Sequence, residues 1–243
     1  MKTVLCTALG LVLAASLGYS QDPAGSKNPG APGAPQAGGE EDLDKAAAKA
    51  GTMTNYSCTI TLKAEGMEGE GQAIPPVEIQ IKPDAPWYLK SGEIEAYRKG
   101  DALVVKEGAA WKRLERSDGG AKAAQALRLV RGPHEILINL KTSSFKEVKK
   151  EDSEGGRCFS GDLTPEALGQ FAMGRIPPKS TGTAKVWVNA EGVVTKYEVA
   201  LESKMKDRAG QEITVKRTST VEIRDIGSAK YDVPEEAAKA FEG

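Results

Sequence analysis

Apolar side chains recur at every second residue through several long segments of this 243-residue chain. Alternation of this kind puts the apolar residues on one face of a pleated strand and the polar residues on the other. The clearest segments are 58–64, 77–81, 184–188 and 193–201. A further segment, 213–223, keeps the pattern but is polar in its middle, at Arg217 and Ser219. The chain is therefore expected to fold mainly into half-buried β-strands.

Shorter strand candidates follow one another closely in the first half of the chain. They are 87–89, 94–97, 103–105 and 111–114. The separators between them have the composition of hairpin turns, so they predict an antiparallel meander. Further strands are expected around 145–148 and 158–159, and a hairpin turn at 189–192. The charged run Lys149–Asp152 is interpreted as a solvated turn.

Helix signals interrupt the strands at a few places. Asp44 is expected to cap an alanine-rich helix that stops at Gly51. The segments 121–130 and 133–140 predict two short helices, the second beginning with a proline. Thr164 is a candidate N-cap for a helix that carries Leu168, Phe171 and Ala172 on one face, and a last short helix is expected from 233 to 241.

These elements predict an α+β fold, with a single curved antiparallel β-sheet and about three short helices against one face. Two separate β-sandwiches are the alternative, because turn signals are frequent. The apolar fraction of 40% is enough for a sizeable core. The folded β domain is expected to span 42–243.

The N-terminal residues 1–20 have the pattern of a signal peptide. A lysine precedes an apolar run, and small residues follow it. A transmembrane anchor is the alternative, but the run is shorter than the roughly 20 residues that a spanning helix needs. Residues 21–41 contain Gly, Pro and Ala but no large apolar side chain, so they predict a disordered tether. The protein is thus expected to be exported, to a periplasmic or extracellular location, with no transmembrane segment in the mature chain.

Two cysteines, Cys58 and Cys158, remain after removal of the signal peptide. An even number of cysteines in an oxidising compartment predicts a disulfide between them. Two free buried thiols are the alternative, because bridging requires Cα atoms within about 7 Å.

The sequence contains no recognisable catalytic constellation. Its 33 Lys and Arg residues balance 34 Asp and Glu residues, which disfavours nucleic-acid binding. His134 is the one histidine, so no histidine cluster exists for a metal or for a Ser-His-Asp site. No glycine-rich phosphate loop is present. No catalytic residue, metal or cofactor is therefore expected, and an enzyme is the least favoured class.

The order of elements resembles a known superfamily. The resemblance is carried by the segments 133–137, 156–159, 185–197 and 222–234. They make the chain similar to the LolA/LppX-like periplasmic lipoprotein carriers and lipid-binding half-barrels. The resemblance implies a strongly bent antiparallel sheet, with helices across its concave side that shelter acyl chains in an apolar gap.

A ligand is expected between the inner face of the sheet and the helices, because short helices with one apolar stripe leave a curved sheet hard to fill. The expected lining residues are Ile60, Leu62, Val77, Ile79, Ile81, Leu127, Ile136, Leu140, Leu168, Phe171 and Trp187. Two functions remain open. One is a carrier or sensor of lipid or lipoprotein acyl chains, whose partner is a lipid or an acylated protein. The other is an envelope interaction or structural module with a filled core, whose partner is another envelope protein.

Overall fold

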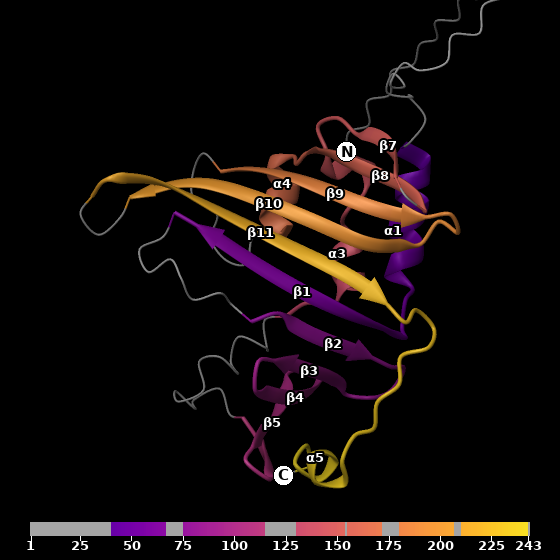
Figure 1. The fold of residues 1–243 in the computed structure, drawn as a ribbon, viewed down its shortest axis with the longest axis vertical. Coiled ribbons are helices and arrows are strands. Elements are labelled where there is room, and N and C mark those ends of the chain that lie inside the picture. Colours follow the sequence, from indigo (N-terminus) through magenta and orange to yellow (C-terminus); the bar gives the residue numbers. More distant parts are fainter. Residues whose placement is uncertain are drawn as a thin grey trace, which may run out of the picture. The chain divides into compact units, whose positions relative to one another are not determined.

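The structure, a computed structural model, describes residues 40–66, 75–114, 130–153, 155–171, 180–206 and 210–242. Within these ranges the chain forms one open, antiparallel sheet of 11 strands (Figure 1). The order across the sheet is β6-β5-β4-β3-β2-β1-β11-β10-β9-β8-β7. The first and last strands in this order do not pair, so the sheet is a half-barrel. This confirms the single curved sheet and rules out two sandwiches.

The strands follow the alternating segments of the sequence. They are β1 (Tyr56–Glu65), β2 (Val77–Ile81), β3 (Trp87–Ser91), β4 (Ile94–Lys99), β5 (Ala102–Glu107), β6 (Ala110–Arg113), β7 (Lys149–Ser153), β8 (Gly156–Asp162), β9 (Thr181–Asn189), β10 (Val194–Lys206) and β11 (Glu212–Arg224). The strands β2 to β6 form the predicted meander. The last strand, β11, inserts between β1 and β10, which joins the two halves of the chain.

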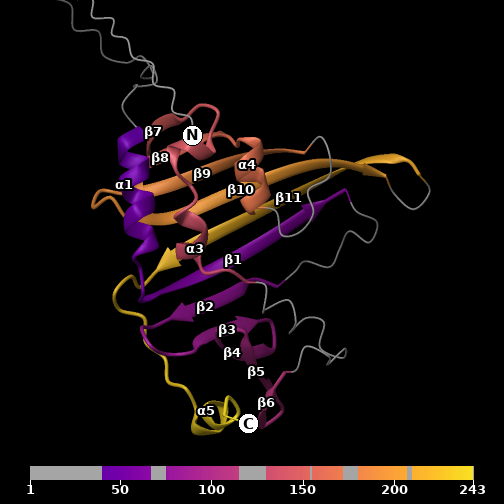
Figure 2. The same cartoon turned by 180° about the vertical axis from the view of Figure 1, so that it is seen from behind.

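Three helices lie across the concave face of the sheet (Figure 2). They are α1 (Glu40–Gly51), α3 (Pro133–Leu137) and α4 (Pro165–Phe171), with a short 3-10 helix, η1 (Thr142–Ser144), between the last two. The predicted N-cap of α4 is confirmed, because the Thr164 hydroxyl accepts a hydrogen bond from the backbone N–H of Ala167 at 3.3 Å. Proline at the first position explains where α3 and α4 begin.

The core lies between these helices and the sheet. Alternate residues of the central strands, such as Ile60, Ile79, Val186 and Val221, share the concave face and are buried in one cluster. That face is the one predicted from the period-two pattern. The neighbouring residues of the same strands point to the convex face and are mostly polar.

The helix α5 (Glu235–Lys239) departs from the prediction of helices on one face. Its Ala237 is buried with Tyr97 and Val104, which alternate with Ala96 and Leu103 of the concave core. The C-terminal segment therefore covers the convex side of β4 and β5. Because the adjacent residues Tyr97 and Ala96 are both buried, these strands are covered on both faces.

Several local predictions were wrong. The helix α1 begins at Glu40, so residues 40 and 41 are not part of a tether; three acidic residues in its first turn favour the positive end of the helix dipole. Phe145 forms only an isolated bridge with Leu163, and no strand covers 145–148. The run Lys149–Asp152 is not a turn but most of β7, an edge strand, where charged side chains discourage pairing with other chains.

The predicted signal peptide, most of the tether and the helix at 121–130 lie outside the described residues, apart from Val130.

Candidate functional site

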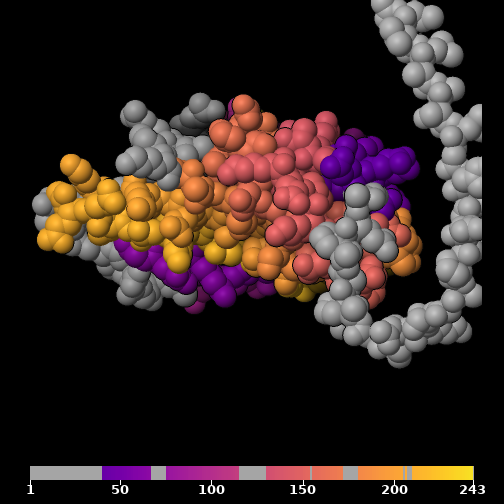
Figure 3. Space-filling view, turned by 90° about the horizontal axis from the view of Figure 1, so that it is seen from above, coloured from indigo at the N-terminus to yellow at the C-terminus, as the bar shows by residue number. Residues whose placement is uncertain are grey.

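The concave face has two ends that are covered differently. Figure 3 shows α1 at one end, in indigo, and the hairpin of β10 and β11 projecting at the other, in orange and yellow. The hairpin pairs as far as Lys206 and Glu212, whereas the pairing of β11 with β1 stops at Lys216. The helix α4 lies over the sheet between α1 and the tip of this hairpin. We call the part of the concave face under α1 the α1 end. We call the part from α4 to the hairpin the α4 end.

The α1 end is filled with side chains. On α1, Leu43 and three alanines are buried, and the alanines let the helix lie close to the sheet. Leu137, Leu140 and Phe159 are fully buried beside it in the same cluster. No apolar space is therefore expected at this end.

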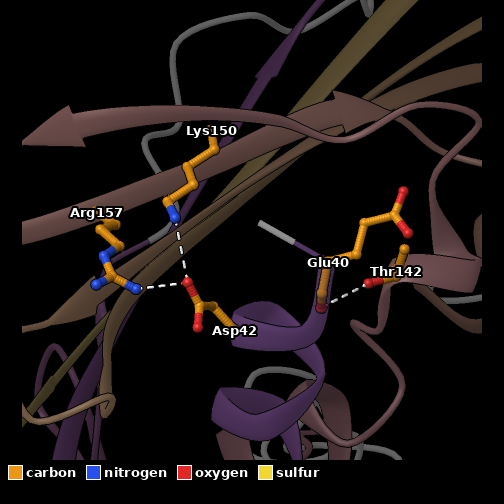
Figure 4. Close-up of polar contacts among 5 residues, drawn as sticks. All are labelled: Glu40, Asp42, Thr142, Lys150 and Arg157. Atoms are coloured by element: carbon orange, nitrogen blue, oxygen red, sulfur yellow. Dashed lines mark hydrogen bonds and ion pairs between the residues drawn. The ribbon is translucent and has the colours of Figure 1, made fainter. Parts of the chain in front are cut away.

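Polar contacts fix the N-terminal turn of α1 to the rest of the fold (Figure 4). Asp42 Oδ2 lies 2.5 Å from Arg157 Nη1 and 3.1 Å from Lys150 Nζ. The Thr142 hydroxyl donates to the Glu40 carbonyl at 3.0 Å, and the Thr142 N–H donates to Asp44 Oδ1 at 2.7 Å. The hydrogen bond from Lys150 is the largest cause that lowers the pKa of Asp42, and Arg157 adds to it. Asp44, predicted to cap its own helix, instead bonds to the N-terminus of η1.

We call the ion pairs of Asp42 with Lys150 and Arg157 the clamp on α1. A cleft of about 480 Å³ lies beside this clamp. Charged residues of α1 and of the β7 to β10 hairpins line it, including Asp42, Lys49, Asp152, Arg157 and Glu191. Both signs of charge are present and much of the lining is already engaged: Lys49 Nζ, for example, donates to the Glu191 carbonyl at 2.9 Å. The lining also includes the apolar residues Ala46, Phe159 and Val188, so the cleft is mixed in character.

His134 is used structurally. Its Nδ1 lies 2.6 Å from the hydroxyl of Tyr56, and its ring meets the ring of Trp87 edge-on at a centroid distance of 5.6 Å. Burial lowers the pKa of His134, with Arg98 adding to the effect and Glu135 opposing it. A second cleft, of about 470 Å³, opens next to it between Trp87, Arg98 and Glu135. This cleft is also lined by charges of both signs.

The two cysteines are free thiols, so the predicted disulfide is wrong. Cys58 lies on the concave side of β1, whereas Cys158 alternates with the buried Phe159 and so faces the convex side of β8. Four inter-strand steps separate β1 from β8, which is roughly 19 Å along the sheet. A disulfide needs Cα atoms within about 7 Å. Burial raises the pKa of the Cys58 thiol to about 12, so a thiolate nucleophile is not available there at neutral pH.

Most of the predicted lining residues gather in the concave core. Those buried are Ile60, Val77, Ile79, Ile81, Leu140 and Leu168; those partly buried against the cluster are Leu62, Ile136 and Phe171. Leu127 lies outside the described residues.

Trp187 was placed wrongly by the sequence argument. Its neighbours Val186 and Val188 are buried in the concave core, so the side chain of Trp187 points to the convex face of β9. There the Lys196 ammonium lies 5.2 Å from the centre of its ring. Trp187 cannot line a gap between the sheet and the helices.

At the α4 end, the helix α4 packs closely against the sheet at Gly182. A Cβ atom at Gly182 would lie 2.5 Å from Leu168 Cδ2 and 2.8 Å from Leu201 Cδ2. The missing side chain at Gly182 therefore lets Leu168 of α4 sit against Leu201 of β10. Three apolar side chains in this region, Leu62, Phe171 and Leu201, are only partly buried. Leu201 was not predicted as a lining residue, although its parity with Tyr197 and Val199 places it on the core face.

In the described part of the chain, no group of three or more His, Cys, Asp or Glu residues is arranged to hold a metal ion. Among the same residues, no helix has the length and apolar character needed to cross a membrane.

No family model matches the sequence, and no curated protein matches it. Several solved structures are similar in fold. LprF from Mycobacterium bovis has 10% identity and a TM-score of 0.48, over 84% of this chain and 100% of that chain. The Mycobacterium tuberculosis lipoprotein LppX has 14% identity and a TM-score of 0.45, over 80% and 97%. A LolA superfamily protein from Nitrosomonas europaea has 11% identity and a TM-score of 0.30, over 81% and 94%.

Proposed function

We propose that this protein is an exported, non-enzymatic binding protein that carries or senses lipid or lipoprotein acyl chains in the cell envelope. The observation that supports it is that three apolar side chains at the α4 end, Leu62, Phe171 and Leu201, are only partly buried. Export rests on the N-terminal pattern of the sequence.

The ligand is expected at the α4 end only, and not along all of the lining residues predicted from the sequence. At the α1 end, Leu43 and its neighbours are already packed as core, and a chain bound there would have to displace them. At the α4 end, an acyl chain can cover apolar surface that is still accessible. Each CH₂ group removed from water there contributes roughly 0.8 kcal/mol.

The second candidate function is an envelope interaction or structural module with a filled core and no ligand. It is favoured by the continuity of the core, which runs from Leu43 to Leu168 in one cluster. The charged residues that line the two clefts also favour an interaction module over a lipid carrier.

Native mass spectrometry and lipid extraction of the protein purified from its own host test the two candidates. The carrier function predicts a co-purifying lipid and a fluorescence gain when the neutral dye Nile red is added. Leu62→Gln should weaken dye binding roughly tenfold, because it replaces an apolar contact with a polar one. Thr61→Gln is the matched control, since Thr61 is the neighbouring residue and faces the other side of β1. Absence of both lipid and fluorescence gain would leave the interaction module as the better candidate.

A further inference from the structure

Charged side chains are distributed differently on the two faces of the central strands. On the convex face of β10 and β11, charges occur in pairs of opposite sign, for example Lys216 with Glu202 at 3.8 Å and Lys196 with Glu222 at 3.4 Å. On the concave face of β2, β1, β11, β10 and β9, within the described residues, Arg217 is the one charged side chain. This arginine is therefore an exception that calls for a physical reason.

The position of Arg217 follows from the strand register. It shares the parity of Val215 and Val221, which are buried, so its side chain projects from the concave face. Its register partners are Ala64 on β1 and Leu201 on β10, with no bulge in either pairing. Side chains of such partners have Cβ atoms about 5 Å apart. Arg217 thus stands directly beside Leu201 at the α4 end.

Leu62 is also near this arginine. Its register partner on β11 is Ser219, two residues from Arg217, and such diagonal neighbours are about 7 to 8 Å apart. Phe171 comes three residues after Leu168, which puts both on one side of α4, and Leu168 lies against Leu201 at Gly182. The positive charge is therefore at the border of the apolar surface assigned to the ligand.

Arg217 has no partner of its own. Its side chain is exposed, and within the described residues its guanidinium makes neither a hydrogen bond nor an ion pair. A guanidinium presents several N–H donors in one plane, which match a carboxylate or a phosphate in a two-pronged arrangement. An unpaired arginine beside apolar side chains has the two parts that recognise an anionic amphiphile.

We infer that Arg217 binds the anionic head group, a carboxylate or a phosphate, of an amphiphile whose hydrocarbon chain lies along Leu62, Leu201 and Phe171. The inference rests on the proposed function and makes it narrower. A free amphiphile with a charged head fits this arrangement, whereas an acyl chain joined to a protein by an uncharged linkage leaves Arg217 without a partner.

Displacement of Nile red by ligands of equal chain length tests the inference. Dodecanoate, dodecyl phosphate and dodecanol are titrated below their micelle-forming concentrations at pH 7.5. The two anions should bind roughly tenfold more tightly than the alcohol, because a charge-assisted contact adds to the same apolar contacts. In Arg217→Gln this ratio should fall to about one. The ratio should also shrink with added salt, because exposed charges are screened.

Lys216→Gln is the matched control. Lys216 is the adjacent residue, carries the same charge and faces the convex side, so the preference for anions should remain. Acetate and inorganic phosphate, which have the head group but no chain, should not displace the dye; displacement by them would indicate a simple anion site and overturn the inference. An unchanged anion-to-alcohol ratio in Arg217→Gln would also overturn it while leaving the carrier function intact. If no twelve-carbon ligand binds, the proposed function and the inference fail together.

Discussion

The α1 end and the α4 end of the concave face are built from similar strands but differ in how the helix above them is attached. The helix α1 has 12 residues, buries Leu43 with three alanines, and is fixed by contacts from Asp42, Asp44 and Lys49. The helix α4 has 7 residues and buries only Ala167 and Leu168. The α1 end therefore contributes more to stability, and at the α4 end three apolar side chains, Leu62, Phe171 and Leu201, stay partly accessible.

The largest expected difference between the ends is in the cost of removing an aromatic ring. Phe159 at the α1 end is fully buried, so Phe159→Ala should lower the free energy of unfolding by about 3 to 5 kcal/mol. Phe171 on α4 is partly buried, so Phe171→Ala should cost about 1 to 2 kcal/mol. Urea unfolding followed by circular dichroism measures both. Equal losses would show that the α4 end is as tightly packed as the α1 end.

How much of this could be read from the sequence depends on whether a feature is local or long-range. Most of the strands, the N-cap Thr164 and the hairpin turn 189–192 follow from residue alternation and turn chemistry, and the structure confirms them. The exceptions are 145–148, which is not a strand, and 149–152, which belongs to β7. The absence of a Cys58–Cys158 bridge depends on strand order, because three strands lie between β1 and β8. No local pattern reveals that order.

Parity contained more information about the site than the sequence interpretation used. Trp187 lies between Val186 and Val188, so its position on the other face was already present in the alternation. The polar middle of 213–223 was noted, but Arg217 has the parity of Val215 and Val221 and so had to lie on the core face. What the sequence could not provide is the neighbour: Leu201 adjoins Arg217 only through the register of β10 and β11.

The second expected difference concerns two buried tyrosine hydroxyls in the core. The Tyr56 hydroxyl is hydrogen-bonded to His134 and helps to hold α3 at the α1 end. Tyr56→Phe should therefore lower the free energy of unfolding by about 1 to 2 kcal/mol. The hydroxyl of Tyr197 is buried and has no hydrogen-bond partner among the described residues. Tyr197→Phe removes an unsatisfied polar group, so stability should stay the same or rise by about 1 kcal/mol.

Urea unfolding of both phenylalanine variants at pH 7.5 makes this comparison. Each change removes one oxygen atom from a fully buried tyrosine, so each variant is a control for the other. Destabilisation of the same size in both would mean that the Tyr197 hydroxyl is also satisfied.

A smaller effect is expected from the clamp on α1. Asp42→Asn removes the ion pairs with Lys150 and Arg157, and should lower the free energy of unfolding by about 0.5 to 1 kcal/mol, because the Asp42 side chain is 37% exposed. Since the pKa of Asp42 is lowered from 3.8, this stabilisation is present above pH 3.8 and is lost as the pH falls below it. Urea unfolding at low and high salt measures the change, and 1 M salt should reduce it.

Glu41→Gln is the matched control for the clamp. It removes one negative charge from the same helix turn, but its pair with Lys45 is highly exposed and lies within α1. No measurable change in unfolding is expected. A loss as large as that of Asp42→Asn would indicate that the helix dipole, not the ion pairs to β7 and β8, stabilises this turn.

The smallest expected effect is the contribution of His134, at the α1 end, to the pH dependence of the free energy of unfolding. Its pKa is lowered from 6.5 mainly by burial, and the folded state therefore disfavours the protonated ring. Nδ1 of the neutral ring is hydrogen-bonded to the Tyr56 hydroxyl. The protonated ring is repelled by Arg98 and attracted by Glu135. Stability from this group is complete above pH 6.5 and is lost as the pH falls below 6.5. Because His134 is half-buried, the loss between pH 7.5 and 5.5 should be a few tenths of a kcal/mol.

Urea unfolding of the unaltered protein and of His134→Gln across this range provides the measurement. Glutamine keeps a hydrogen-bond acceptor but does not titrate, so the variant should show a flatter dependence on pH. Most carboxylates are fully ionised above pH 5.5, which leaves His134 as the main titrating group in this window. A steeper dependence in the variant would contradict the lowered pKa. If the free energy of unfolding has the same pH dependence in both proteins, α3 can move away from Tyr56 and expose the imidazole at little cost. The α1 end would then be less rigid than its packing indicates.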